Sequence, residues 1–180
     1  MVSEDTDPMP VTIAAIKTML DMNGIHYSDV GRPDEIGMGW ESARYVDPDT
    51  GRKSVAILIR LEESGRYIKI FAPACFSVAG VAHKAAMLEA LLGVCWRTKL
   101  LQFELDESDG EIRAMVEWPI EDGTVTFAQL SRSIRAIVYL LDQYSEIIVK
   151  AGRTGVISWT DESDAKRALG MALLRELFGR

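Results

Sequence analysis

Residues 88–96 read Leu88-Glu89-Ala90-Leu91-Leu92-Gly93-Val94-Cys95-Trp96, an apolar run of helical character. Two short runs follow, Phe103-Glu104-Leu105-Asp106 and Asp109-Gly110-Glu111-Ile112-Arg113. Because Asp, Ser and Gly favour tight turns, these runs predict an antiparallel hairpin. Thr126 and Gln129 then have the spacing of a capping box, and apolar residues follow them at helical intervals as far as Ile148. The stretch from Leu88 to Val149 therefore predicts a helix–hairpin–helix unit, and none of its groups is arranged for making or breaking bonds.

The sequence before this unit predicts one helix and three strands. The helix is expected from about Pro10 to Asn23, with Gly24 as its left-handed cap. Alternating residues from Ile36 to Glu41 predict a first strand, and the turn signature at residues 47–51 separates it from a second, residues 54–61. That second strand is apolar on both faces, which is typical of an interior strand. Residues 66–72 predict its hairpin partner, which Pro73 is expected to end.

The sequence of residues 81–97 predicts the second helix. Five apolar residues are expected to form its core-facing stripe, which Leu91 widens: Val81, Ala85, Leu88, Leu92 and Cys95. Strands are expected at residues 100–106 and 111–118, and Pro119 is expected to stop the pairing. After the third helix, Gly152 and Gly155 predict a break. A fourth helix is expected from about Asp161 to Phe178, since acids stand at its start and Arg175 near its end.

These elements predict an α+β fold in the order α-β-β-β-α-β-β-α-α. Short links favour an antiparallel five-stranded sheet with helices packed on one face. The expected organisation is a disordered N-terminus at residues 1–9, an α+β domain at 10–155 and a helical extension of that domain at 156–180. The strand order within the sheet does not follow from these signals.

Composition narrows the class of protein. The chain has 180 residues, of which 48% are hydrophobic, enough for one domain with a full core. Its net charge of −7 and its scattered Lys and Arg residues argue against nucleic-acid binding. The acidic start lacks the features of a signal peptide, and no apolar run is long enough to span a membrane. We therefore expect a cytoplasmic protein in which Cys75 and Cys95 are free buried thiols.

The residue types that carry chemistry are sparse and poorly spaced. His26 and His83 have no Cys or second His at zinc-ligand spacing, so no metal site is expected. A Cys75–His83 pair is the one thiol arrangement left open, with packing of Cys75 as the favoured reading. Gly37 and Gly39 fail as a nucleotide-binding loop, and the residues from Asp106 to Gly110 read as a hairpin turn, not a calcium loop. The sequence predicts no catalytic residue and no cofactor.

The tryptophans are the most plausible anchors for a protein partner, because aromatic residues dominate interface hot spots. The four are Trp40, Trp96, Trp118 and Trp159. Core packing is the competing reading for each. Trp118, beside Pro119 at a strand end, and Trp40 are the partner-binding candidates.

The order of elements, the hairpin Phe103-Glu104-Leu105-Asp106 with Asp109-Gly110-Glu111-Ile112-Arg113, and the helix ending Leu141-Asp142-Gln143-Tyr144 resemble the YbjN family. Members of that family are described as bacterial regulators of sensory transduction and share the fold of type III secretion chaperones. The resemblance covers residues 11–150. It implies a non-catalytic module that binds another protein, or regulates through such binding, commonly as a homodimer, without a cofactor. The alternative is a small-molecule-binding or enzymatic domain whose site is assembled from distant residues.

Overall fold

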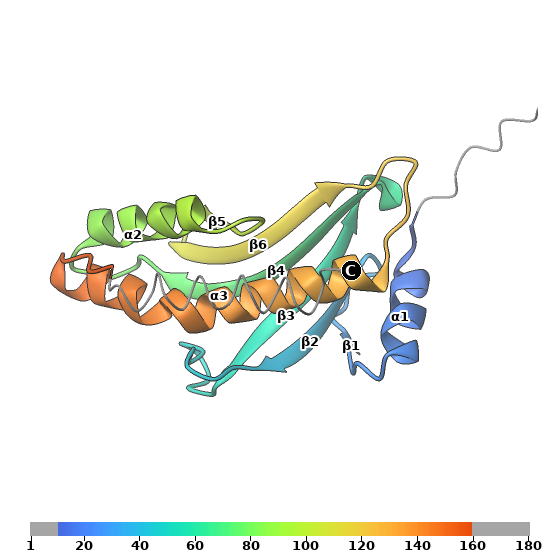
Figure 1. Ribbon diagram of the computed structural model, residues 1–180, viewed down its shortest axis with the longest axis horizontal. Helices are drawn as coiled ribbons and strands as arrows, with labels where there is room; N and C mark the ends of the chain where they lie inside the picture. Colours follow the sequence, from blue (N-terminus) through green and yellow to red (C-terminus); the bar gives the residue numbers. More distant parts are fainter. Residues whose placement is uncertain (1–10, 160–180) are drawn as a thin grey trace, which may run out of the picture.

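The computed structural model describes residues 11–159, so the predicted disordered residues 1–9 and the predicted helix at 161–178 lie outside the described residues. The described chain forms a sheet with helices against one face (Figure 1). Its helices are α1 (Ile13–Met22), α2 (Lys84–Arg97) and α3 (Phe127–Thr154), with a short 3₁₀ turn, η1, at Glu63–Gly65. Its strands are β1 (Ser28–Asp29), β2 (Glu35–Glu41), β3 (Ser54–Glu62), β4 (Tyr67–Ser77), β5 (Gln102–Leu105) and β6 (Glu111–Pro119).

The sheet is antiparallel throughout the described residues, in the order β1-β2-β3-β4-β6-β5. The α+β class, the antiparallel pairing and the helices on one face confirm the prediction. The predicted count of five strands is one short, because β1 is a two-residue strand that pairs Ser28 with Gly37. Two residues are too few to show an alternating pattern in a sequence.

Strand β4 continues beyond Pro73, so the prediction that Pro73 ends it is wrong. The pairing with β6 shifts register between Ala72 and Phe76, which places Pro73 in a bulge where no ladder donor is needed. Ala74 has a positive φ of 47° there, and its N–H donates to Glu111 Oε1 at 2.9 Å. The strand then resumes with Phe76 opposite Ile112.

Helix α3 begins and ends as its sequence signals indicate, except that it continues through Gly152. The Thr126 N–H donates to Gln129 Oε1, and the Gln129 N–H donates to Thr126 Oγ1, so the predicted capping box is confirmed. Gly155, with a φ of 75°, is the left-handed cap. The helix does not break at Gly152, where the chain instead comes close to the segment that leads into α2. A Cβ at this position would lie 2.9 Å from Val81 Cγ1 and 3.1 Å from Met87 Sδ. Its missing side chain lets the start of α2 approach α3.

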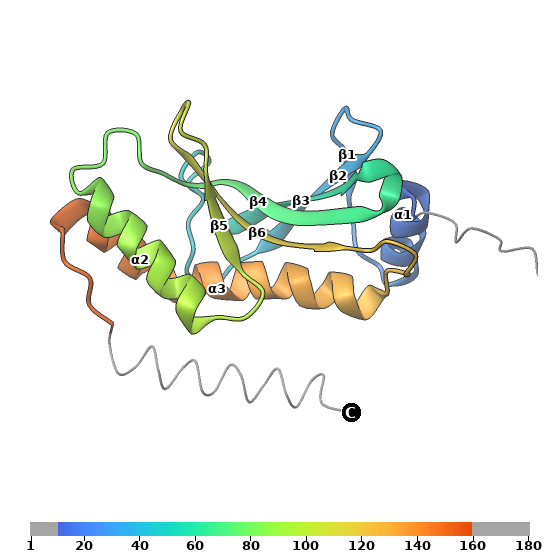
Figure 2. The ribbon, with the colours of Figure 1, turned by 90° about the horizontal axis from the view of Figure 1, so that it is seen from above.

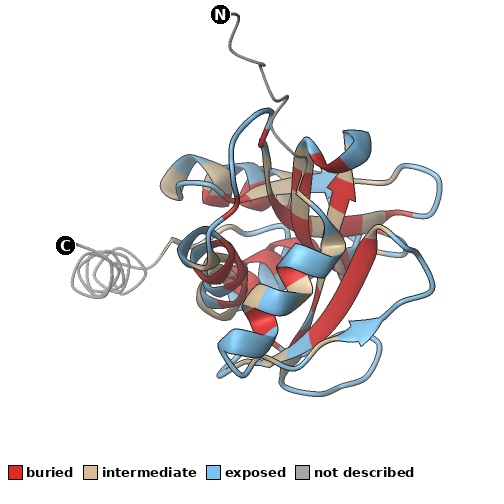
Figure 3. Ribbon diagram, turned by 90° about the vertical axis from the view of Figure 1, so that its right-hand side faces the viewer, coloured by how far each residue is buried: buried red, intermediate tan, exposed pale blue. Residues whose placement is uncertain are grey.

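The core lies between the helices and the sheet (Figures 2 and 3). The side chains that α3 buries there are Leu130, Ile134, Ile137, Val138, Leu141, Tyr144 and Ile148. Strands β3, β4 and β6 meet them with Val55, Ile57, Ile59, Ile68, Ile70, Ala72, Ile112, Ala114 and Val116. From α1, Ile16 and Leu20 belong to the same core. No helix within residues 11–159 has both the length and the apolar character needed to cross a bilayer.

Ion pairs cover the opposite face of the sheet. Arg60 pairs with Glu35 of the neighbouring strand and lies 5.1 Å from the centre of the Phe71 ring. Lys69 Nζ lies 3.3 Å from Glu117 Oε2. Long charged side chains bury apolar surface with their stems, which explains why Phe71 is buried on a face without helices.

The inward side of α2 differs from the predicted stripe. The buried residues of α2 are Met87, Ala90, Leu91 and Val94, whereas Leu92 of the predicted stripe is 71% exposed. Val81 precedes the helix. The prediction is confirmed for Leu91 and wrong for Leu92. Helix α2 carries apolar residues on most of its circumference, so periodicity alone does not select the side that faces the core.

Adjacent residues of α3 provide a matched test of this packing. Replacing the fully buried Ile148 with Ala is expected to lower the free energy of unfolding by about 2–5 kcal/mol, because it removes buried methyl groups and leaves a cavity. The control Val149→Ala changes a side chain that is 51% exposed and is expected to stay within about 0.5 kcal/mol. Urea unfolding of both variants measures the difference, and equal losses would contradict the assigned face of α3.

Candidate protein-binding hollow

The sheet divides at one end, and this division creates a hollow. Strand β3 pairs with β4 from Leu58 onward, while Ser54–Ile57 pair with β2. Beyond the bulge, Phe76 and Ser77 of β4 pair with β6. The two halves of the sheet therefore diverge, and α3 crosses in front of the gap in the view of Figure 1.

Tyr45 fills the inner part of this gap. It comes from the β2–β3 loop, is 3% exposed, and its hydroxyl donates to the Cys75 carbonyl at 3.1 Å. Its ring packs edge-on against Phe76, with the ring centres 6.1 Å apart. Burial raises the pKa of the Tyr45 phenol, so this hydroxyl stays protonated and acts as a structural donor.

Asp142 of α3 holds the loop that carries Tyr45. Its carboxylate accepts three backbone N–H groups, from Ala43 at 2.9 Å, Arg44 at 2.9 Å and Tyr45 at 2.8 Å. Hydrogen bonds to a charged acceptor are stronger than neutral ones, so a single side chain fixes the loop to the helix. Asp47 Oδ1 orders the next turn by accepting from the N–H groups of Asp49 and Thr50, as the predicted turn signature requires.

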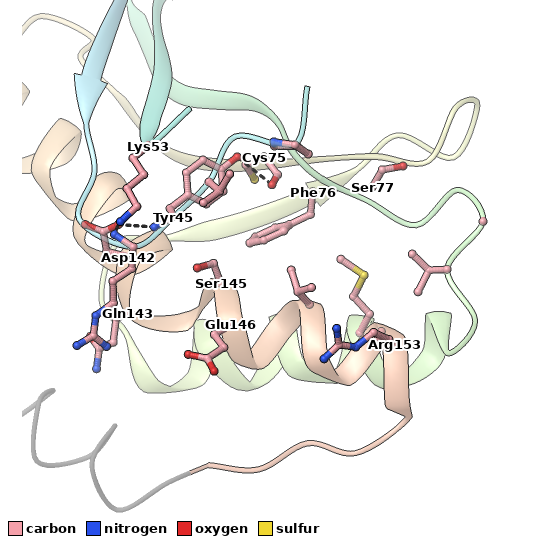
Figure 4. Close-up of a pocket in the computed structure, with 18 of the residues that line it drawn as sticks. Tyr45, Lys53, Cys75, Phe76, Ser77, Asp142, Gln143, Ser145, Glu146 and Arg153 are labelled. Atoms are coloured by element: carbon pink, nitrogen blue, oxygen red, sulfur yellow. Dashed lines mark hydrogen bonds between the residues drawn. The ribbon is translucent and has the colours of Figure 1, made fainter. Parts of the chain in front are cut away.

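The hollow has a volume of about 970 Å³ and lies between α3, the β2–β3 loop, the end of β4 and residues 80–82 (Figure 4). Its apolar lining includes Val46 and Val149, which are 49% and 51% exposed. Pro48, Phe76, Val81 and Met87 extend this lining. The surface combines buried aromatic and aliphatic walls with apolar side chains that solvent reaches.

The rim of the hollow carries more positive than negative exposed side chains. Arg44, Lys53 and Arg153 line it as exposed cations, and Glu146 is an exposed carboxylate. The Asp142 carboxylate is engaged by the three backbone donors. The rim thus contrasts with the chain as a whole, whose net charge is −7. Such a rim favours a ligand that carries negative charge beside apolar groups.

The thiol in the hollow is not activated as a nucleophile. Cys75 is buried, its thiol donates to the Ile112 carbonyl at 3.2 Å, and burial raises its pKa far above neutrality. A thiol in this state is not a nucleophile. The His83 ring lies against Gly155, so Cys75 and His83 have separate contacts. Among residues 11–159, no three His, Cys, Asp or Glu side chains are grouped to hold a metal ion.

The other predicted features lie outside the hollow. Residues 106–110 form the hairpin turn, with the Gly110 N–H donating to the Asp106 carbonyl at 2.8 Å. Trp40 and Trp118 are partly buried, pack against the core, and stand opposite Val55 and Ile68 in the sheet. Their role as partner anchors stays a prediction. Trp96 is the tryptophan that solvent reaches most, at 89% exposed.

Sequence reasoning missed the hollow because its walls come from four segments: α3, the β2–β3 loop, the end of β4 and residues 80–82. Asp142 and the backbone groups that it binds are 97 to 99 positions apart. The sequence shows the turn signature at residues 47–51 and the proline at position 73. Neither feature indicates that the β2–β3 loop and the end of β4 both border a hollow over α3.

Comparison with solved structures identifies the fold. YbjN from E. coli, described as a proposed transcription regulator, superposes with a TM-score of 0.53 at 13% identity, over 74% of this chain and 90% of that chain. The chain has the fold of YbjN. This confirms the resemblance predicted from the hairpin and the capped helix. A structure of the HopA1–SchA chaperone–effector complex also matches, with a TM-score of 0.49 at 15% identity, over 76% of this chain and 99% of that chain. Neither a family model nor a curated protein matches the sequence.

Asp142 provides a test of how the hollow is built. Replacing Asp142 with Ala leaves three backbone N–H groups of the β2–β3 loop without their acceptor, and we expect the free energy of unfolding to fall by about 2–4 kcal/mol. Amide exchange at residues 43–45 should accelerate at the same time. The control Glu146→Ala, on the exposed side of the same helix, should change stability by less than about 0.5 kcal/mol. Unchanged exchange at residues 43–45 would show that Asp142 does not hold the loop.

Proposed function

We propose that this protein is a non-catalytic module that binds another protein, or regulates through such binding, and that it captures an apolar segment of its partner in the hollow above α3. The observation that carries the proposal is the hollow itself: its lining is apolar and partly open to solvent, its rim is cationic, and its thiol is buried and protonated. These features favour binding by apolar burial with charge-selected orientation. The partner segment is expected to carry Asp or Glu beside its apolar residues.

The fold agrees with the proposal, but the proposal rests on the hollow. YbjN is described as a proposed transcription regulator, and the other matching structure is a chaperone–effector complex. A binding role for this chain agrees with both descriptions. The homodimer that the sequence resemblance implies stays a prediction, and so does the cytoplasmic location.

Matched variants of the hollow test this function. The full-length chain, used as bait, is expected to capture a stoichiometric protein partner, and Val149→Asp is expected to abolish capture by placing a charge in the apolar lining. Met22→Asp makes the same kind of change at an 81% exposed apolar residue of α1, far from the hollow, and should leave capture intact. Circular dichroism verifies that both variants fold. Equal capture by the Val149→Asp and wild-type baits would refute the hollow as the binding site, and the reproducible absence of a stoichiometric partner would refute the function.

The volume of the hollow favours one alternative, the binding of a small molecule. Ligand pockets commonly enclose about 300–1,000 Å³, and this hollow lies at the upper end of that range. A thermal-shift screen against anionic, partly apolar metabolites tests it, because a ligand at 100 times its Kd stabilises the folded state by about 2.7 kcal/mol. A dose-dependent rise in Tm that Val149→Asp removes and Met22→Asp keeps would favour this alternative over a protein partner.

A further inference from the structure

The bulge of β4 decides which side chain stands at one wall of the hollow. Ala72 of β4 lies opposite Ala114 of β6. Phe76 lies opposite Ile112, so four positions along β4 (76 minus 72) face two along β6 (114 minus 112). In a regular ladder residue 74 would lie opposite Ile112. The two additional residues therefore bring the ring of Phe76, in place of the methyl group of Ala74, to the lining of the hollow.

The backbone conformation at this bulge is unfavourable for the residue that adopts it. Ala74 has a φ of 47°, in the left-handed region, where the Cβ of any residue other than glycine is crowded by the backbone. Its N–H donates to Glu111 Oε1 at 2.9 Å, so a side chain replaces the ladder carbonyl. The Cys75 thiol makes a second bond across the bulge, to the Ile112 carbonyl at 3.2 Å. Strained backbone persists only where its neighbours hold it, and here two side chains do so.

Glu111 is itself held in place on the face of the sheet without helices. It alternates along β6 with Arg113 and Glu117, so the three side chains lie on that face. Arg113 binds the Glu111 carboxylate through two bonds, from Nε to Oε1 at 2.7 Å and from Nη2 to Oε2 at 3.0 Å. These bonds hold the pKa of the Glu111 carboxyl below its usual range, so the group stays ionised at neutral pH. A fixed, charged acceptor makes a stronger hydrogen bond to the Ala74 N–H than a neutral one.

The residues that follow Ala74 shape the hollow. The Cys75 carbonyl accepts the Tyr45 hydroxyl at 3.1 Å (Figure 4). The Phe76 ring meets the Tyr45 ring edge-on, with the ring centres 6.1 Å apart. Both contacts require that the chain leave Ala74 in one direction. Glu111 lies outside the lining of the hollow, yet the backbone group that it binds is next to a residue of that lining.

We propose that Glu111 is a positioning residue for the hollow: by holding the bulge of β4, it sets the places of the Cys75 carbonyl and the Phe76 ring. This role rests on the proposed function, since it concerns binding in the hollow. Affinity in the hollow is then controlled by a side chain outside its lining, through the backbone of Ala74.

The Cys75 thiol reports the state of the bulge without any ligand. In a full-length Cys95→Ser parent it is the only thiol, and its residue is 1% exposed. We expect Glu111→Ala to raise its rate of modification by an aromatic disulfide reagent at least tenfold, because Ala74 then loses its acceptor and leaves the left-handed conformation. The control Glu117→Ala removes a paired carboxylate from the same strand and face and should change the rate less than twofold.

Adding Ala74→Gly to Glu111→Ala separates the bulge from the ion pair. Glycine adopts a positive φ without strain, so the bulge no longer needs Glu111, while the pair with Arg113 stays broken. We expect the thiol rate to return to within threefold of the parent, and circular dichroism verifies that each variant folds. A rate for Glu111→Ala equal to that of the parent would overturn the proposal, as would a raised rate that Ala74→Gly does not restore.

An anionic apolar dye, 8-anilinonaphthalene-1-sulfonate, measures the effect on the hollow, because its sulfonate and rings match the cationic rim and the apolar lining. The part of its binding that Val149→Asp removes belongs to the hollow. In fluorescence titrations, Glu111→Ala should raise the Kd of that part at least fivefold, Glu117→Ala should stay within twofold, and added Ala74→Gly should restore the parent value. An unchanged Kd beside a faster thiol reaction would overturn the proposal. Dye binding that Val149→Asp leaves intact would count against the hollow, and so against the proposed function, while the thiol rates still decide whether Glu111 holds the bulge.

Discussion

The rest of the structure depends on the burial of α3 along the sheet. Twelve residues of this 28-residue helix are buried, and the large apolar ones meet three strands. A fully buried Leu or Ile contributes roughly 1.5–3 kcal/mol, so this contact is a large source of stability for the fold. The other contacts are arranged around it: α2 meets α3 at Gly152, the β2–β3 loop is bound to Asp142, and Trp159 lies against Tyr144. Because these contacts share one rigid helix, their relative positions are fixed.

The hollow forms where β3 and β4 separate while α3 continues along the sheet. A sheet twists, and the irregularity from Pro73 to Cys75 bends β4 away from β3, which opens the apolar layer above α3. Tyr45 closes the inner part of the opening, and the Asp142 clamp keeps Tyr45 in place. What stays open is the outer part, lined by Val46, Val149 and the cationic rim. The same bulge that disturbs the pairing therefore opens the hollow.

Strong local signals were sufficient to predict much of the fold. The capping box at Thr126, the strict helical period after it, and the turn at residues 106–110 each specify one conformation without help from distant residues. Helix α2 lacks this property: Leu88, Leu91, Leu92 and Val94 point in different directions, and the contact with α3 decides which of them are buried. The local sequence of β4 does not specify its conformation either. At the bulge after Pro73, the Ala74 N–H donates to the side chain of Glu111, which belongs to another strand. The hollow was beyond reach for the same reason, since its geometry is set by contacts between segments about a hundred residues apart.

The strand order has a consequence for how this molecule behaves at high concentration. Within residues 11–159, the outermost strands of the sheet are β1 and β5, with two and four residues. Each covers part of its neighbour: β1 pairs with Ile36 and Gly37 of β2, and β5 pairs with residues 112–115 of β6. Open backbone hydrogen-bonding groups at a sheet border are the template on which chains stack into fibrils, and short borders offer little template. The middle of β3, residues 58–60, pairs with β2 on one side and with β4 on the other. Beyond the ends of β1 and β5 in the described chain, β2 stays open at residues 38–41 and β6 at residues 116–119, so each border offers copies of this protein only a short ladder on which to stack.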